Sequence, residues 1–215
     1  IQEKNGNLIV RGGKWIQPNK PLNCGNSATT MRLLMGALAG QPITAELTGT
    51  IGLQRRPMGR VARPLREMGA SISSDNAPLV IKGGNLHGII HNSEVASAQV
   101  KAALLLAALQ AKGESTIHQP GPSRDHSERM LCELGIKLKT DDHSVTIQPS
   151  EKSLAATNIS VPGDCSSAAF LIAAAVLVPG SKVTLRNIGI NPTRTGMLDV
   201  LSSMGADISV LYNSE

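Results

Sequence analysis

A motif typical of a helix start occurs three times in this chain, with 70 residues between consecutive copies. Hydroxyl side chains precede a long apolar run in each copy, at Ser27, Ser97 and Ser167. This period is too long for a two-helix solenoid repeat and is typical of a βαβ-type subdomain. Because helix N-termini carry unpaired N–H groups and a partial positive charge, several that converge would bind an anion. The repeat predicts both the fold class and the region that carries function.

Each copy continues with an amphipathic segment that ends in glycine and then with a short alternating stretch. The amphipathic segments are 56–69, 124–135 and 194–205, and the alternating stretches are 70–73, 136–139 and 206–209. A glycine after a helix permits the left-handed turn that ends it, and period-two alternation indicates a half-buried strand. A strand followed by two glycines also occurs twice, at 8–13 and 79–84. We therefore expect an α/β chain of repeated units.

The apolar runs of the second and third copies are nonpolar on almost every side. They cover residues 97–112 and 166–178 and are rich in alanine. Helices of this kind are buried, whereas the second helix of each copy has a polar outer face. Neither run reaches the roughly 20 residues that a membrane span needs. We expect one inner and one outer helix per copy, with a sheet between them, and no membrane association.

The composition favours a small anionic ligand over a nucleic acid. The net charge of +5 admits either, but the chain has one Trp, one Tyr and one Phe. Single-stranded nucleic acids are usually bound by aromatic stacking, and the basic residues here are dispersed, so we expect no nucleic-acid partner. The three cysteines, Cys24, Cys132 and Cys165, have no metal-binding or redox spacing, which fits inert thiols in a cytoplasmic protein.

No metal or cofactor is expected either. Asp125 and His126 are adjacent, so they do not share a helix face, and a structural or surface role is the better interpretation. The GxxxxGK[ST] spacing of a nucleotide-binding loop is absent.

Six segments of the chain resemble the 5-enolpyruvylshikimate-3-phosphate synthase (EPSP synthase) family, in the order in which that family has them. They span residues 22–208 and read LNCGNSATTMRLLMGAL, RRPMGRVARPLREMGA, VASAQVKAALLLAAL, PSRDHSERML, VPGDCSSAAF and NPTRTGMLDVLSSMGADI. The resemblance implies transfer of the enolpyruvyl group of phosphoenolpyruvate to the 5-hydroxyl of shikimate 3-phosphate, with release of phosphate. This reaction belongs to the shikimate pathway of aromatic amino acid biosynthesis. The implied fold is an inside-out α/β barrel of two lobes, each built of three βαβαββ units.

The resemblance also implies that the chain is a fragment. Residues 1–161 would be most of one lobe, and residues 162–215 the first part of the other. The family's opening Gly-Asp-Lys-Ser segment would precede Ile1, and its proton-transfer residues would follow Glu215. We expect a monomer that binds substrate without turning it over alone, with catalytic residues outside this sequence.

Nine positions match the family's substrate contacts. Those for phosphoenolpyruvate are Ala28, Thr29, Arg32 and Arg56, and those for shikimate 3-phosphate are Ser97, Ala98, Gln99, Ser123 and Arg124. A planar guanidinium can donate two hydrogen bonds to a carboxylate or phosphate, which suits the two arginines at the phosphoenolpyruvate positions. Arg32 could otherwise be a solvated helix arginine. The two serines could also be N-caps worth about 1 kcal/mol each, and both roles can hold at once.

Several neighbours are weaker candidates. Lys101 follows Ser97 by one helical turn and could point at the phosphate. Asp164 is expected to cap the third apolar helix, and Arg55 and Arg60 are expected to be surface charges.

Ala28 departs from the pattern of many family members, which have glycine there. By resemblance, the herbicide glyphosate occupies the phosphoenolpyruvate position and is slightly longer than that substrate. An extra methyl group in a packed site costs about 1–3 kcal/mol. We therefore expect weak glyphosate binding, as in a glyphosate-insensitive enzyme.

Two other functions remain open from the sequence. The enolpyruvyl transferase that acts on UDP-N-acetylglucosamine shares the implied fold, but usually has a cysteine in the loop that corresponds to residues 49–54, where this chain has none. A non-catalytic RNA-binding module is the other alternative, and the scarcity of aromatic residues disfavours it.

Overall fold

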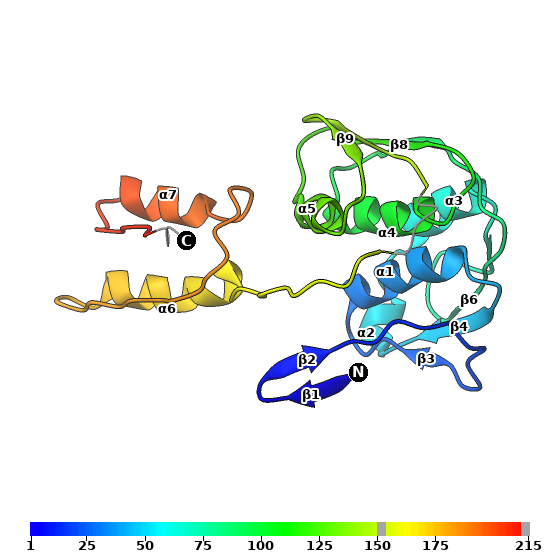
Figure 1. The fold of residues 1–215 in the computed structure, drawn as a ribbon. Helices are drawn as coiled ribbons and strands as arrows, with labels where there is room; N and C mark the ends of the chain where they lie inside the picture. Colours follow the sequence, from blue (N-terminus) through cyan, green and yellow to red (C-terminus); the bar gives the residue numbers. More distant parts are fainter. Residues whose placement is uncertain (150–153, 212–215) are drawn as a thin grey trace. The chain divides into compact units, whose positions relative to one another are not determined.

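The computed structural model describes residues 1–149 and 154–211 and divides into two compact units, Ile1–Leu154 and Ala155–Glu215 (Figure 1). The first unit contains two complete copies of the repeat, and the second contains the helices of the third. The lobe boundary expected after residue 161 stays a prediction.

The two copies in the first unit have the same order of elements. The first copy is β3 (Leu22–Asn23), α1 (Ala28–Ala39), β4 (Thr44–Thr48), α3 (Gly59–Glu67), β5 (Ser71–Ile72) and β6 (Leu79–Lys82). The second copy is β7 (Ile90–Asn92), α4 (Ala98–Ala108), β8 (Ser115–His118), α5 (His126–Glu133), β9 (Leu138–Thr140) and β10 (Ser144–Ile147). The first copy also has a short helix, α2 (Ile51–Gln54), that the sequence interpretation missed. The predicted βαβαββ unit is confirmed in both copies.

Each copy forms a four-stranded sheet with the same topology. The strand orders are β3-β4-β6-β5 and β7-β8-β10-β9. In both sheets the first pair is parallel, with Leu22 opposite Leu47 and Ile90 opposite Thr116, and the other two pairs are antiparallel. The 70-residue sequence repeat is therefore a repeat of sheet topology.

The inner helices α1 and α4 pack side by side and run parallel (Figure 1). Near their N-termini the Gln99 amide donates to the Thr29 hydroxyl at 2.6 Å, and near their C-termini the Gln110 amide donates to the Ala37 carbonyl at 3.1 Å. These partners are 70 and 73 residues apart, close to the repeat period. The parallel pairing places the starts of the two helices at the same end of the unit.

A glycine permits this close approach. A Cβ on Gly36 of α1 would lie 2.0 Å from the Ala103 carbonyl oxygen of α4, so no larger residue fits unless the helices separate. Apolar side chains complete the helix contact and the surrounding core, including Met31, Met35 and Leu104, which are at most 1% exposed. The prediction of a buried inner helix is correct for α1 and α4. The prediction of a sheet between inner and outer helices is wrong for the first copy, because α3 packs directly on α1 and α4.

The third copy is different. Its helices α6 (Cys165–Leu177) and α7 (Gly196–Ser203) form as predicted, but Phe170 and Leu177 of α6 are 81% and 79% exposed. The prediction that this helix is buried is wrong for the described residues. The predicted strand at 206–209 is also wrong, since within 155–211 the ladder pairing is limited to a single parallel bridge between Gly163 and Ile188. Without a sheet beside it, alternation alone does not make a strand.

The first strand predicted to end in two glycines also differs from its later counterpart. β2 (Asn7–Ile9) pairs with β1 (Gln2–Lys4) in a two-stranded hairpin, and both strands are exposed. β6 instead lies between two strands and buries Leu79 and Ile81. The two glycine-ended strands are therefore not equivalent in the fold.

No helix among residues 1–149 and 154–211 combines the length and apolarity that crossing a membrane requires.

Candidate functional site

The starts of α1 and α4 form the centre of the candidate site. Ser27 caps α1 by accepting a hydrogen bond from the Thr30 N–H at 3.1 Å, and Ser97 caps α4 by accepting from the Val100 N–H at 3.4 Å. Because the helices are parallel, their partial positive N-terminal charges add at the same place. The expected cap at Ser97 is confirmed, and the convergence of helix starts predicted from the repeat holds for the first two copies.

Arg32 connects these two helices to the loop before α3. Its guanidinium donates through Nη1 to the Gln99 amide oxygen and through Nη2 to the Pro57 carbonyl at 3.1 Å. Its Nε is buried and has no partner among the described residues. Arg32 is therefore a partly buried, positioned cation rather than a solvated helix arginine.

The electrostatic surroundings of Arg32 favour an anion. Burial lowers the pKa of Arg32, and the positive charges of Arg60 and then Arg56 lower it further. In the part of the chain that the structure describes, Arg32 and Arg56 form no ion pair with a carboxylate. A bound carboxylate or phosphate would offset both the desolvation and the repulsion between the arginines.

Arg56 lies in the segment between α2 and α3, and its side chain is exposed. The Asn76 amide donates to the Arg56 carbonyl at 3.2 Å and to the Gln54 carbonyl at 3.3 Å, which fixes the backbone. Among residues 1–149 and 154–211 the Arg56 guanidinium has no ion-pair partner. Arg55 and Arg60 are exposed, as predicted.

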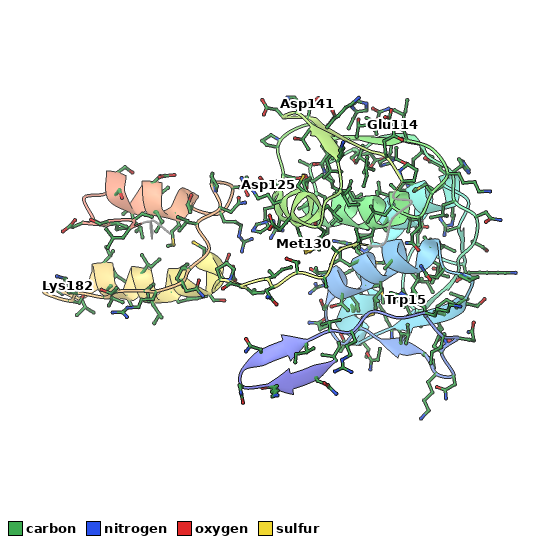
Figure 2. The ribbon with its side chains drawn as sticks, viewed as in Figure 1. Trp15, Glu114, Asp125, Met130, Asp141 and Lys182 are labelled. Carbon is green, nitrogen blue, oxygen red and sulfur yellow. The ribbon has the colours of Figure 1, made fainter. Side chains whose placement is uncertain are left out.

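Ser123 and Arg124 lie in the segment before α5. The prediction that Ser123 caps α5 is wrong, because the helix begins at His126 with Asp125 in the cap position (Figure 2). The Ser123 hydroxyl instead donates to the Gln119 amide oxygen at 2.6 Å, and the Gln119 amide nitrogen donates to the Ser97 carbonyl at 3.2 Å. Gln119 therefore brings Ser123 to the Ser97 end of α4, and no sequence motif pointed to it.

Other side chains have structural roles. Lys101 is buried and forms an ion pair with Glu128, so the suggestion that it points at a phosphate is wrong. Asp164 caps α6 by accepting from the Ser166 N–H at 3.1 Å, as predicted. Asp125 pairs with Arg129 at 2.7 Å, and no cluster of three potential metal ligands occurs among the described residues.

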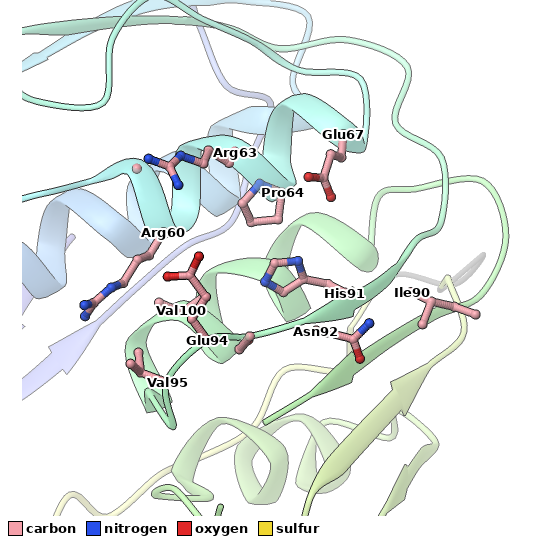
Figure 3. Close-up of a pocket in the computed structure, with 12 residues that line it drawn as sticks. Arg60, Arg63, Pro64, Glu67, Ile90, His91, Asn92, Glu94, Val95 and Val100 are labelled. Carbon is pink, nitrogen blue, oxygen red and sulfur yellow. The ribbon is translucent and has the colours of Figure 1, made fainter. Parts of the chain in front are cut away.

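A separate cavity of about 370 Å³ lies between α3 and the segment around β7 (Figure 3). One wall carries Arg60, Arg63 and Glu67, and the other carries His91 and Glu94. Burial lowers the pKa of His91, while the charges of Glu67 and Glu94 act in the opposite direction. None of the nine positions predicted to contact substrate lines this cavity. The candidate site is therefore the surface at the helix starts.

The fold and site define a class: an α/β repeat protein in which the starts of two inner helices and the side chains of Arg32 and Arg56, which form no ion pair among the described residues, give a positively charged surface suited to an anion. The family model described as EPSP synthase (3-phosphoshikimate 1-carboxyvinyltransferase) matches residues 1–214. The chain therefore belongs to the EPSP synthase family.

Individual relatives agree with this assignment. The chain is 49% identical over 216 residues to a 3-phosphoshikimate 1-carboxyvinyltransferase of Bacillus licheniformis, covering 97% of this chain and 50% of the relative. It is 49% identical to one from Endomicrobium trichonymphae, covering 98% and 50%. The solved structure of EPSP synthase from Acinetobacter baumannii matches with a TM-score of 0.80 and 46% identity, over 88% of this chain and 44% of that chain. The chain spans about half the length of the curated relatives it matches.

Proposed function

We propose that this chain is the substrate-binding part of a 3-phosphoshikimate 1-carboxyvinyltransferase. The full reaction would transfer the enolpyruvyl group of phosphoenolpyruvate to the 5-hydroxyl of shikimate 3-phosphate. The observation that carries the proposal is the hydrogen bond between Arg32 and Gln99. It joins a residue assigned to one substrate directly to a residue assigned to the other, so the two binding regions are adjacent.

The chemistry needs two anionic substrates held against each other. Arg32 and Arg56, with Ala28 and Thr29 at the start of α1, would bind phosphoenolpyruvate. The residues that would bind shikimate 3-phosphate surround the start of α4: Ser97, Ala98, Gln99, Ser123 and Arg124. Holding the substrates together makes the reaction effectively unimolecular, and the fixed positive charges stabilise the charge of the transition state.

The reaction proceeds by addition and elimination. The 5-hydroxyl oxygen bonds to C2 of phosphoenolpyruvate and loses its proton, while the methylene carbon gains one, giving a tetrahedral intermediate. Loss of phosphate from C2 and of a proton from the methyl group restores the double bond in the product. The groups that move these protons are assigned to the part of the enzyme outside this chain, so we propose that the chain alone binds without turnover.

The family assignment supports this function over the two alternatives, transfer to UDP-N-acetylglucosamine and RNA binding. We further propose that the chain is a fragment of a cytoplasmic, monomeric enzyme, with a lobe boundary near residues 161 and 162. Three cysteines without a disulfide fit a reducing compartment.

Calorimetric titration of shikimate 3-phosphate into the chain tests the proposal. We expect saturable binding that the double substitution Ser97→Ala/Arg124→Ala abolishes, and no binding of UDP-N-acetylglucosamine. Absence of binding to the unmodified chain would overturn the proposal that this part of the enzyme binds substrate alone.

The arginine at the phosphoenolpyruvate position offers a matched pair of variants. With shikimate 3-phosphate present, Arg56→Ala should weaken phosphoenolpyruvate binding by roughly tenfold or more, because a charged hydrogen-bonding partner is lost. Arg55→Ala removes a neighbouring exposed charge and should change the affinity little. Equal losses in both variants would show that Arg56 acts through general charge alone.

We also propose that glyphosate binds weakly because of Ala28, which is buried at the first residue of α1. Ala28→Gly should increase glyphosate affinity by a factor of roughly 5 to 150 in the presence of shikimate 3-phosphate. Calorimetry with phosphoenolpyruvate provides the control, because the affinity for this shorter ligand should change less on substitution of Ala28. An unchanged glyphosate affinity would contradict the proposal.

A further inference from the structure

Gln119 is a buried polar side chain between the two segments that we propose to bind the phosphate group of shikimate 3-phosphate. It follows β8 directly and is 7% exposed. Its backbone N–H donates to the His143 carbonyl at 2.7 Å, which fixes it to the loop before β10. Its side chain joins the Ser97 carbonyl, at the start of α4, to the Ser123 hydroxyl, before α5.

The orientation of this amide follows from its partners. The Ser97 carbonyl can only accept a hydrogen bond, so the amide nitrogen of Gln119 must face it at 3.2 Å. The amide oxygen therefore faces Ser123, whose hydroxyl must donate its proton at 2.6 Å. The amide nitrogen of Gln119 therefore serves as the donor to Ser97, and its amide oxygen as the acceptor from Ser123.

A second buried link joins the same two helices. Lys101 of α4 and Glu128 of α5 form an ion pair and are 6% and 7% exposed. The second carboxylate oxygen of Glu128 is buried without a partner in the described residues. Buried ion pairs contribute little net stability, because the desolvation of both charges offsets their attraction. A positioning role therefore explains this pair better than stability does.

We infer that Gln119 is a positioning residue for the phosphate of shikimate 3-phosphate. It holds the N-terminus of α4 and the Ser123–Arg124 segment at a fixed separation, so that both act on the same phosphate group. The inference rests on the proposed function.

The hydrogen bond to Gln119 limits how Ser123 can contact a phosphate. A serine hydroxyl has one proton, and the Ser123 proton is engaged by Gln119. A phosphate dianion offers acceptors only, so Ser123 would contact it through its backbone N–H while the hydroxyl stays on Gln119. In that arrangement the hydroxyl orients the segment and does not compete for the ligand.

The test compares the ligand with and without its phosphate. Gln119→Met keeps the length of the side chain and removes both hydrogen bonds, and it should lower the affinity for shikimate 3-phosphate roughly tenfold. Its affinity for shikimate, which lacks the phosphate, should change less than about twofold. General damage to the fold would instead lower the affinities for both ligands by similar factors.

Two further variants complete the test. Gln119→Glu keeps size and polarity but cannot donate to the Ser97 carbonyl when ionised, so it should also lose affinity selectively for the phosphorylated ligand. Thr116→Val is the control, because it removes a hydrogen bond to Thr146, of 2.9 Å, from the same strand β8 and should leave both affinities unchanged. Circular dichroism checks that each variant is folded.

The outcomes separate the inference from the proposed function. Selective loss for shikimate 3-phosphate in either Gln119 variant supports the inference. Unchanged affinity, or equal loss for both ligands in both Gln119 variants, overturns it while leaving the proposed function intact. If the unmodified chain binds no shikimate 3-phosphate, the proposal that this chain binds the substrate alone fails, and the inference fails with it.

Discussion

Helices α4 and α6 have nearly the same kind of sequence and very different surroundings. Both are alanine-rich and apolar on almost every side. In α4, eight of eleven residues are buried, whereas in α6 two of thirteen are. The residues of a helix therefore do not determine its burial by themselves.

The difference comes from what packs against each helix. α4 lies against α1 and also contacts α3 and β8 within the first unit. In the described residues 155–211 the secondary structure consists of the two helices α6 and α7 and the single β-bridge. A helix that is apolar on all sides is expected to be buried by other elements. The pattern does not predict that neighbouring residues in the sequence supply those elements.

Truncating one leucine in each helix should give the largest difference between α4 and α6 in the free energy of unfolding. Leu104 in α4 is 1% exposed and Leu171 in α6 is 57% exposed. Leu104→Ala should reduce the free energy of unfolding by about 2–5 kcal/mol, because it leaves a cavity in a packed core. Leu171→Ala should change it by less than about 0.5 kcal/mol. Urea unfolding followed by circular dichroism measures both, and similar losses would mean that α6 is as well covered in solution as α4.

A second pair of variants tests the close helix contact. Gly36→Ala places a methyl group 2.0 Å from the Ala103 backbone, so α1 and α4 must separate, at a cost of about 1–3 kcal/mol. Gly196→Ala, at the start of α7, meets nothing within 4 Å and should stabilise by up to about 1 kcal/mol. The two changes are chemically identical and should have opposite signs in thermal or urea unfolding. A neutral Gly36→Ala would show that the helices can move apart freely.

Much of the fold follows from local signals that recur along the sequence. Hydroxyl caps at Ser27 and Ser97, and glycines such as Gly69 and Gly135 with φ of 111° and 86°, mark the ends of helices in each copy. Because these signals recur at one period, the repeated βαβαββ unit could be predicted. The exposure of α6 and the lack of a strand at 206–209 could not be predicted, because both depend on which neighbours are present.

The candidate site was predictable in part for the same reason. Positions at helix starts, such as Ser97, are specified by nearby residues. The roles of Gln119 and Lys101 depend on partners that lie 22 and 27 residues away in the chain and meet them only in the folded unit. Sequence reasoning therefore placed Lys101 on the correct helix but gave it the wrong partner.

The smallest expected effect concerns stability at acid pH, and we test it with one carboxylate from each unit, Asp75 and Asp164. The Arg66 side chain hydrogen-bonds to Asp75 at 2.7 Å and lowers its pKa. In the second unit, the Ser166 N–H and then Arg194 lower the pKa of Asp164. Both groups are more acidic when folded, so the unfolded chain takes up protons first as the pH falls.

Each carboxylate therefore contributes stability that is fully present above the ordinary aspartate pKa of about 3.9 and is lost as the pH falls through the lower folded value. Asp75→Asn and Asp164→Asn should each reduce the dependence of the urea midpoint on pH below about 4, because the substituted amide does not titrate. Asp75 is linked to two arginines of a packed helix, whereas Asp164 lies in the unit whose main helix is largely exposed. We therefore expect the larger change from Asp75→Asn. A larger change from Asp164→Asn would mean that the second unit limits the acid stability of the chain, and the contrast between the two units would then extend from packing to electrostatics.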